Sequence, residues 1–172
     1  MAKQEFWQKA AEIVRDAGGR IVGRTKLQKV AYLLELSGLG TGFQFEYRHY
    51  GPYSEDLSGA IRLADAFELV KEEERQADWG GRYSVYTATE RAGARAQGPR
   101  AVFAEKAAQI GAVELELAAT AAYLSAVEGE ADPWEQTKWL KPEKATDQRL
   151  ESAKRAYRQL RQVAVPKSLP DI

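Results

Sequence analysis

Apolar residues recur at helical spacing in two stretches near the start of the chain, residues 5–19 and residues 23–38. The first stretch ends in a glycine pair, which tolerates the left-handed backbone of a helix C-terminus. In the second stretch, Thr25 is followed three residues later by Gln28, which is the pattern of a capping box. The pattern therefore predicts two helices, with Thr25 as the cap of the second.

The period changes to two in residues 43–50, FQFEYRHY, which is typical of a strand. The residues that share one face are Phe43, Phe45, Tyr47 and His49. We therefore expect an aromatic face that turns to the interior and that includes His49. Gly51-Pro52 is predicted to end this strand, because proline has no N–H for a sheet ladder.

The next segment predicts a helix followed by a β-hairpin. Ser54 is placed to cap a helix that runs to about Phe67. Residues 69–88 contain two strand-like runs around the turn QADWGG, and Thr89 is predicted to cap a further helix, TERAGARAQ. Helix, helix, helix, hairpin is the order of a winged helix, here with an extra strand between the second and third helices.

The pattern changes again after Gly98-Pro99. Residues 100–128 carry apolar residues at seven-residue spacing, which predicts one long helix. Asp132 and Pro133 begin a short helix, and a basic amphipathic helix is predicted over residues 147–163.

These elements predict an α+β, mostly helical fold. Residues 1–98 are expected to form a winged-helix-like domain with a short extra strand and a hairpin wing. Residues 99–172 are expected to form a helical extension packed on that domain.

Composition then narrows the classes of function. The 172 residues include no cysteine and one histidine, which excludes disulfides, thiolate metal sites and multi-histidine zinc sites. We therefore predict no metal site and no cofactor. No apolar run reaches the ~18 residues that a membrane span needs, and the N-terminus lacks the apolar core of a signal peptide. A cytoplasmic location without a membrane partner is the expectation.

The single histidine lies in the stretch RHYGPYSEDL, residues 48–57, and two chemical roles are conceivable for it, metal binding and nucleophilic catalysis. A metal site would need carboxylates at a spacing that the sequence does not identify. A nucleophile pairing Ser54 with His49 lacks the strand, elbow and helix context of serine hydrolases. Packing, a turn and a helix cap explain the whole motif, whose members are His49, Gly51, Pro52, Tyr53 and Ser54. No catalytic residue is predicted, and we expect the protein not to be an enzyme.

Three segments, TKLQKVAYLLEL, FEYRHYGPYSEDLSGAIRLADAFELV and YSVYTATERA, resemble a known family over about residues 20–95. They resemble the YwgA-like bacterial proteins and, more remotely, the SocA-like antitoxin (Panacea) domain, in which a KLQK–Y segment precedes a GP-containing turn. The resemblance to the antitoxin domain implies a role in neutralising or presenting a partner protein. Winged-helix character implies DNA binding, and neither implication carries a catalytic residue.

Charge distribution bears on the choice between these partners, because the 25 basic and 25 acidic residues cancel. The predicted third helix is acidic, and the first hairpin strand carries Glu72-Glu73-Glu74, so both would repel phosphates. DNA contacts would therefore come from the start of the second helix or from the last helix. The candidate residues are Arg24, Lys26, Lys29, Lys154, Arg155, Arg158 and Arg161.

The favoured hypothesis is a non-catalytic protein–protein interaction module, antitoxin-like or adaptor-like. Trp79 falls at the hairpin turn, where it would anchor a partner protein, and Glu72 and Glu74 would steer a basic partner towards it. The alternative is a winged-helix DNA-binding transcriptional regulator.

The C-terminal half separates its charges along the chain. Residues 101–137 carry one basic and seven acidic groups, and residues 138–172 carry nine basic and four acidic groups. These segments most simply pair within an antiparallel helical unit, and the same pattern would support a homodimer.

Overall fold

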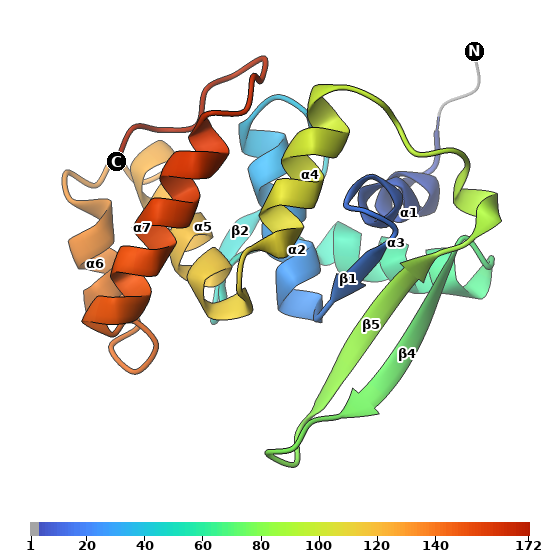
Figure 1. Cartoon of the computed structure of the whole chain (residues 1–172), viewed down its shortest axis with the longest axis horizontal. Helices are drawn as coiled ribbons and strands as arrows, with labels where there is room; N and C mark the ends of the chain where they lie inside the picture. The colour runs from blue at the N-terminus through green and yellow to red at the C-terminus, as the bar shows by residue number, and fades with distance from the viewer. Residues whose placement is uncertain (1–3) are drawn as a thin grey trace.

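The structure is a computed structural model that describes residues 4–172. Helices and short strands alternate in its first half (Figure 1). The elements there are α1 (Phe6–Asp16), β1 (Arg20–Val22), α2 (Arg24–Leu36), β2 (Glu46–Arg48), β3 (Gly51–Tyr53), α3 (Glu55–Ala66), β4 (Val70–Gln76) and β5 (Arg82–Ala88). The second half contains α4 (Pro99–Gln109), α5 (Ala112–Ala126), α6 (Pro133–Leu140) and α7 (Asp147–Arg161).

Strands β1, β4 and β5 form an antiparallel sheet in the order β1-β5-β4. Helices α1, α2 and α3 precede the β4–β5 hairpin, in the order that the sequence predicts. The predicted α+β, mostly helical fold class is therefore confirmed. Strand β1 was not predicted, because its three residues are too few to show an alternating pattern.

Helix α2 begins at Arg24, before the predicted cap, so the assignment of Thr25 was wrong. Gly23 occupies the N-cap with φ 103°, a backbone conformation that favours glycine. Gln28 is buried and reaches α3 instead: its amide donates to the Ser54 carbonyl (3.0 Å) and accepts from the Ser54 N–H (2.8 Å). The apparent capping box is thus a tertiary contact between α2 and the start of α3.

Helix α3 begins and ends where the sequence predicts. The Leu57 N–H donates to the Ser54 hydroxyl (3.2 Å), which confirms Ser54 as the N-cap. The apolar face from Leu57 to Ala64 is buried, whereas Phe67, just after the helix, is exposed.

The helix predicted over residues 100–128 is two helices, α4 and α5. They are separated at Ile110, whose backbone is extended (φ −67°, ψ 140°). Residues 115–124 of α5 are buried on every side, because α2, α6 and α7 all pack against this helix. The seven-residue apolar spacing therefore spans two helices and does not mark one continuous stripe.

The remaining helices follow the sequence with one exception. Asp132 caps α6 by accepting from the Glu135 N–H (3.2 Å), and α7 occupies most of its predicted range. Thr89 caps only a single 3-10 turn, Glu90–Ala92, so the longer helix predicted there was wrong.

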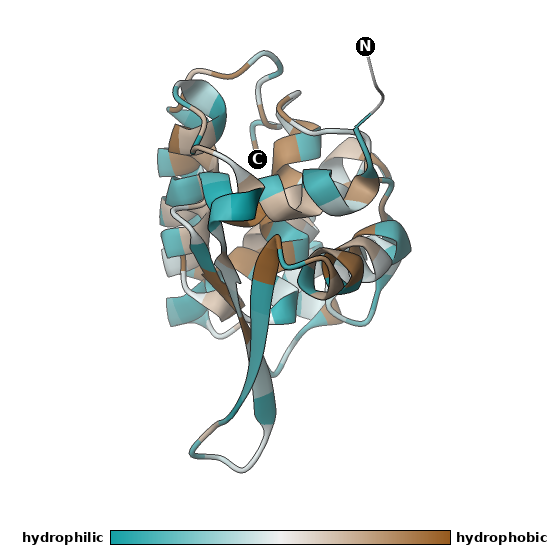
Figure 2. Ribbon diagram, turned by 90° about the vertical axis from the view of Figure 1, so that its right-hand side faces the viewer, coloured by the Kyte–Doolittle hydropathy of each residue, from teal (hydrophilic) through white to brown (hydrophobic). Residues whose placement is uncertain are grey.

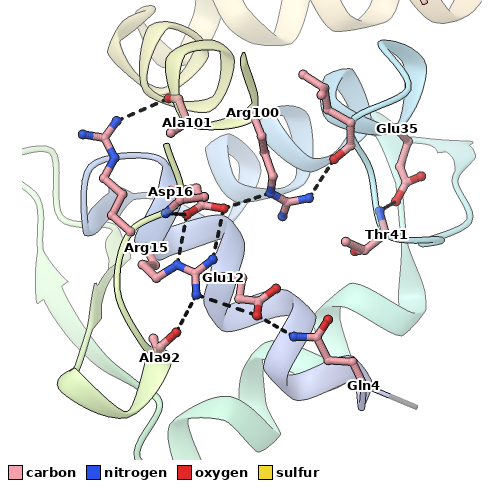
Figure 3. A network of polar contacts seen from close by, with 12 residues as sticks. Gln4, Glu12, Arg15, Asp16, Glu35, Thr41, Ala92, Arg100 and Ala101 are labelled. Atoms are coloured by element: carbon pink, nitrogen blue, oxygen red, sulfur yellow. Dashed lines mark hydrogen bonds and ion pairs between the residues drawn. The ribbon is translucent and has the colours of Figure 1, made fainter. Parts of the chain in front are cut away.

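A buried ionic network ties the two halves together (Figure 3). The Asp16 carboxylate, at the end of α1, accepts from Arg15 Nε (3.0 Å), Arg100 Nε (2.9 Å) and the Ala96 N–H (3.1 Å). Arg100, in α4, also donates to the Leu39 carbonyl (2.7 Å). Burial alone would raise the pKa of Asp16, but these hydrogen bonds outweigh it and lower that pKa.

One hydrophobic core contains residues from both predicted domains, 1–98 and 99–172, although residues 1–3 lie outside the described residues. The β4–β5 hairpin leaves this core and projects from the body, coloured mainly teal and white in Figure 2. Among residues 4–172, no helix has both the length and the apolar character needed to cross a membrane.

Candidate functional site

The tip of the β4–β5 hairpin presents Trp79, which is 79% exposed. The turn is closed by the Ala77 N–H, which donates to the Gly81 carbonyl (2.7 Å), and by the Gly80 N–H, which donates to the Ala77 carbonyl (2.9 Å). The indole lies directly over Gly81, where a Cβ would come within 1.6 Å of the ring. Glycine at this position therefore lets the ring lie against the turn.

The carboxylates of β4 are paired within the chain, which corrects the expectation of a free acidic strand. Glu72 is only 15% exposed in its side chain and accepts from the Ser84 hydroxyl (2.6 Å) and from Arg24 (3.3 Å). Glu74 lies within 3.4 Å of Arg24 and 3.6 Å of Arg82. Because arginines neutralise both groups, Glu72 and Glu74 are poorly suited to steering a basic partner.

A groove of about 890 Å³ lies between the hairpin, α2, α3 and the β2–β3 turn. We call it the basic groove, because its charged lining residues are Arg24, Lys29, Arg62, Arg82 and Lys144 against a single carboxylate, Glu72. Its aromatic lining residues are Tyr50, Tyr53, Trp79 and Tyr86. A second hollow of about 380 Å³ shares Arg24, Trp79 and Arg82 with it, so Trp79 borders both.

A cluster of three lysines and one glutamate, all buried except the half-buried Lys144, lies beside the groove and supports the RHYGPY stretch. We call it the lysine cluster; its members are Lys29, Lys141, Lys144 and Glu116. Lys141 donates to the His49 carbonyl (3.1 Å), and Lys29 donates to the Pro52 carbonyl (2.9 Å). The β2–β3 hairpin is therefore held against the body through its backbone oxygens.

The lysine cluster holds three ammonium groups and one carboxylate. Glu116 is 3% exposed and lies 3.2 Å from Lys141 and 3.0 Å from Lys144. Lys29 is 1% exposed, and burial, with Lys141 and Lys144 nearby, lowers its pKa to about 8 although Glu116 acts in the opposite direction. Sequence reasoning missed Lys141, Lys144 and Glu116, because nothing local marks their approach to residue 29.

His49 is exposed in the turn between β2 and β3, so the prediction that it packs in the interior was wrong. Phe43 is buried and Tyr47 half-buried as predicted, but the strand alternation ends at Arg48. Gly51-Pro52 does not end the sheet; it begins the return strand β3, with Pro52 opposite Tyr47. A two-stranded sheet accommodates proline there because each strand has an edge without a partner.

Gly51 is the constrained residue of this motif. Its φ is 93°, and an added Cβ would lie 2.6 Å from the Thr120 hydroxyl oxygen. Both the backbone conformation and the approach of α5 therefore require glycine. Tyr53 is half-buried, with the Arg48 guanidinium 4.9 Å from its ring centroid, and Ser54 is the helix cap described above.

The basic residues considered for nucleic acids do not form one surface. Arg24 lines the basic groove, but Lys26 donates to the Ala108 carbonyl (2.9 Å), and Lys29 is buried. The remaining four, Lys154, Arg155, Arg158 and Arg161, lie on α7, at the end of the molecule away from the hairpin (Figure 1).

Two of the α7 residues are already engaged within the chain. Lys154 lies 3.6 Å from Glu151. Arg161 donates to the Leu169 carbonyl (3.2 Å) and pairs with Asp171 (3.1 Å). Arg155 and Arg158 are exposed.

Comparison with known proteins leaves the family open, because no family model and no curated protein matches the chain. The resemblance to YwgA-like proteins and to the SocA-like antitoxin domain therefore stays a prediction. Within residues 4–172, no three His, Cys, Asp or Glu side chains gather into a group that could hold a metal ion.

Proposed function

We propose that this chain is a non-catalytic module that binds a partner protein through the β4–β5 hairpin, as an antitoxin or adaptor would. The observation that carries the proposal is Trp79, an exposed indole at the tip of a hairpin that projects from the body. Tryptophan offers a large apolar area at a small cost in conformational entropy, which is why it often dominates the energy of an interface.

The surroundings of Trp79 suit a docking role. One side of its ring is supported by Gly81, and the ring borders two hollows, so a partner seated in either hollow would contact it. Tryptophan in a solvent-exposed turn contributes little to the stability of its own chain. Binding to another protein would bury this large side chain and would account for its place at the hairpin tip.

Capture of a partner by immobilised protein, with nuclease present, tests this proposal. Trp79→Ala should weaken capture by ~2 kcal/mol, or about thirtyfold, with an unchanged melting temperature. Trp139→Ala is the matched control, because Trp139 is 75% exposed on α6, away from the hairpin. The captured protein is then purified and its affinity for both variants measured. Equal binding by Trp79→Ala, or equal loss in both variants, would refute the proposal.

A winged-helix DNA-binding regulator is the second candidate, and one observation favours it. Arg62 of α3 and Arg82 of β5 line the same groove as Arg24, next to the helix and wing that such proteins use. Phosphate contacts predict an affinity that falls steeply with salt, and Arg62→Gln should reduce the slope by ~1. Reversal of Arg155 and Arg158 to Glu tests α7 in the same way. Absence of duplex binding at low salt would eliminate this candidate.

A further inference from the structure

The basic groove carries more positive than negative charge. Five basic side chains line it, of which Arg24 and Arg82 pair with Glu72 and Glu74, and Lys144 pairs with Glu116. Arg62 is exposed and forms no ion pair within residues 4–172. A ligand that brings negative charge would therefore find one unpaired guanidinium there, next to cations that share their carboxylates.

The most buried of these groups is Lys29. Its ammonium donates to the Pro52 carbonyl, and the nearby carboxylate, Glu116, is shared by Lys141 and Lys144. The low pKa of Lys29, about 8, follows from its burial and from these neighbouring lysines. Burial of the Lys29 ammonium is unfavourable in the free protein. A carboxylate that enters the groove would stabilise this ammonium, and the stabilisation would add to the free energy of binding.

The aromatic residues of the groove indicate that the ligand is not purely ionic. Tyr50 is 57% exposed, with the Lys144 ammonium 4.7 Å from its ring centroid, and Trp79 stands at the hairpin end. Aromatic rings beside ammonium and guanidinium groups suit a chain that alternates acidic and apolar side chains.

The shape of the groove and the depth of Lys29 favour a protein segment over a DNA duplex. Phosphates of a duplex are fixed on the outside of a wide cylinder, whereas a glutamate or aspartate side chain can extend towards the buried Lys29.

We propose that the basic groove binds an acidic, partly apolar segment of the partner protein, with its carboxylates held by Lys144 at one end and by Arg24, Arg62 and Arg82 along the rest, while the charge of Lys29 attracts them from beneath the groove surface. This assignment rests on the proposed function and reverses the charge that Glu72-Glu73-Glu74 suggested for the partner.

Fluorescence anisotropy with synthetic probes tests the assignment without the natural partner. The probes are a labelled peptide of four Glu-Asp-Leu repeats, its counterpart of Gln-Asn-Leu repeats, and a labelled 20-base-pair duplex. We expect the acidic peptide to bind, the neutral peptide to bind at least tenfold more weakly, and the duplex to bind more weakly than the acidic peptide at 150 mM salt.

Charge-removing variants locate the site. Arg62→Gln should weaken acidic-peptide binding about threefold, as expected for an exposed cation, and Lys29→Met about tenfold. Lys144→Gln provides a second variant at the same end in case Lys29→Met is poorly folded. Arg155→Gln, on α7, is the matched control and should have no effect.

The outcomes separate this inference from the proposed function. Equal binding of both peptides, or equal loss with Arg62→Gln and Arg155→Gln, overturns the groove assignment while Trp79-dependent capture can still stand. Tighter binding of the duplex, lost with Arg62→Gln, overturns it in favour of a nucleic-acid ligand. Intact acidic-peptide binding without Trp79-dependent capture overturns the hairpin proposal alone.

Discussion

The two hairpins of this protein are both antiparallel, but only one of them is held against the body. The β2–β3 hairpin lies over α5, and Lys29 and Lys141 donate to its backbone carbonyls. The β4–β5 hairpin joins the sheet at its base and projects Trp79 from its far end. Residues of the β2–β3 hairpin are therefore expected to maintain the fold, and Trp79 is expected to bind a partner. Substitutions in the β2–β3 hairpin should change the free energy of unfolding, whereas Trp79→Ala should change partner binding.

The largest effect is expected at the glycines of the two turns. Gly51→Ala should lower the free energy of unfolding by about 3 kcal/mol, because it adds left-handed strain and a collision with Thr120. Gly80→Ala has a similar φ, 92°, but no atom within 4 Å, so it should cost only about 1 kcal/mol. Urea unfolding of both variants measures the difference. Equal losses in the free energy of unfolding would show that the β2–β3 hairpin is no more constrained than the β4–β5 hairpin.

A second effect concerns the Lys29 ammonium, which lies beneath the β2–β3 hairpin. Folding lowers the pKa of Lys29 from 10.5 to about 8, chiefly through burial, so between these values the unfolded chain binds more protons. Stability contributed by Lys29 therefore rises as pH increases above about 8, and the full cost of the buried charge applies below that pH. Relative to Lys29→Met, the native protein should gain about 2 kcal/mol between pH 8 and pH 10.

Denaturant unfolding of both proteins at several pH values measures this gain. The comparison cancels other groups that titrate in the same range, because both proteins contain them. If the free energy of unfolding changes with pH in the same way for both proteins, then folding does not lower the pKa of Lys29.

A smaller effect on stability is expected at Ser54, where the β2–β3 hairpin joins α3. Ser54→Ala removes the hydroxyl that accepts from the Leu57 N–H, and should cost about 1 kcal/mol. Ser58→Ala is the control on the same helix, because the Ser58 side chain forms no hydrogen bond within residues 4–172. An indistinguishable pair of melting temperatures would show that the cap contributes nothing.

The smallest effects on stability are expected at the two exposed positions, His49 and Trp79. His49→Gln and Trp79→Ala should each change the free energy of unfolding by less than about 0.5 kcal/mol, since neither side chain is buried. Thermal unfolding measures both. A loss of several degrees for His49→Gln would show that the imidazole packs after all, and would restore the interpretation based on strand alternation.

Local patterns predicted the elements whose partners lie close in the sequence. Ser54 and Asp132 were recognised as caps because the N–H groups they bind are three residues away. The hairpin around Trp79 was recognised because turn residues and strand periodicity occur together there. Errors occurred where a distant segment decides the outcome: Gln28 binds Ser54, and α5 is enclosed by three helices.

The groove illustrates the same limit for the site. Arg24 and Lys29 were identified as basic residues of interest, but Arg62, Arg82 and Lys144 join them only because α3, β5 and the α6–α7 connection meet there. Charge counted along the chain suggested an acidic wing, yet arginines from α2 and β5 neutralise Glu72 and Glu74.

By itself the sequence determined the fold class, most helix boundaries and the position of Trp79 at a hairpin turn, because capping, periodicity and turn formation act within a few residues. Only the tertiary structure decided that His49 is exposed, that Gly51 abuts α5 and that Lys141 and Lys144 share one buried glutamate beside Lys29. Burial and charge pairing depend on which segments meet in space, and in this chain the residues that meet at the lysine cluster are separated by up to 115 positions, from Lys29 to Lys144.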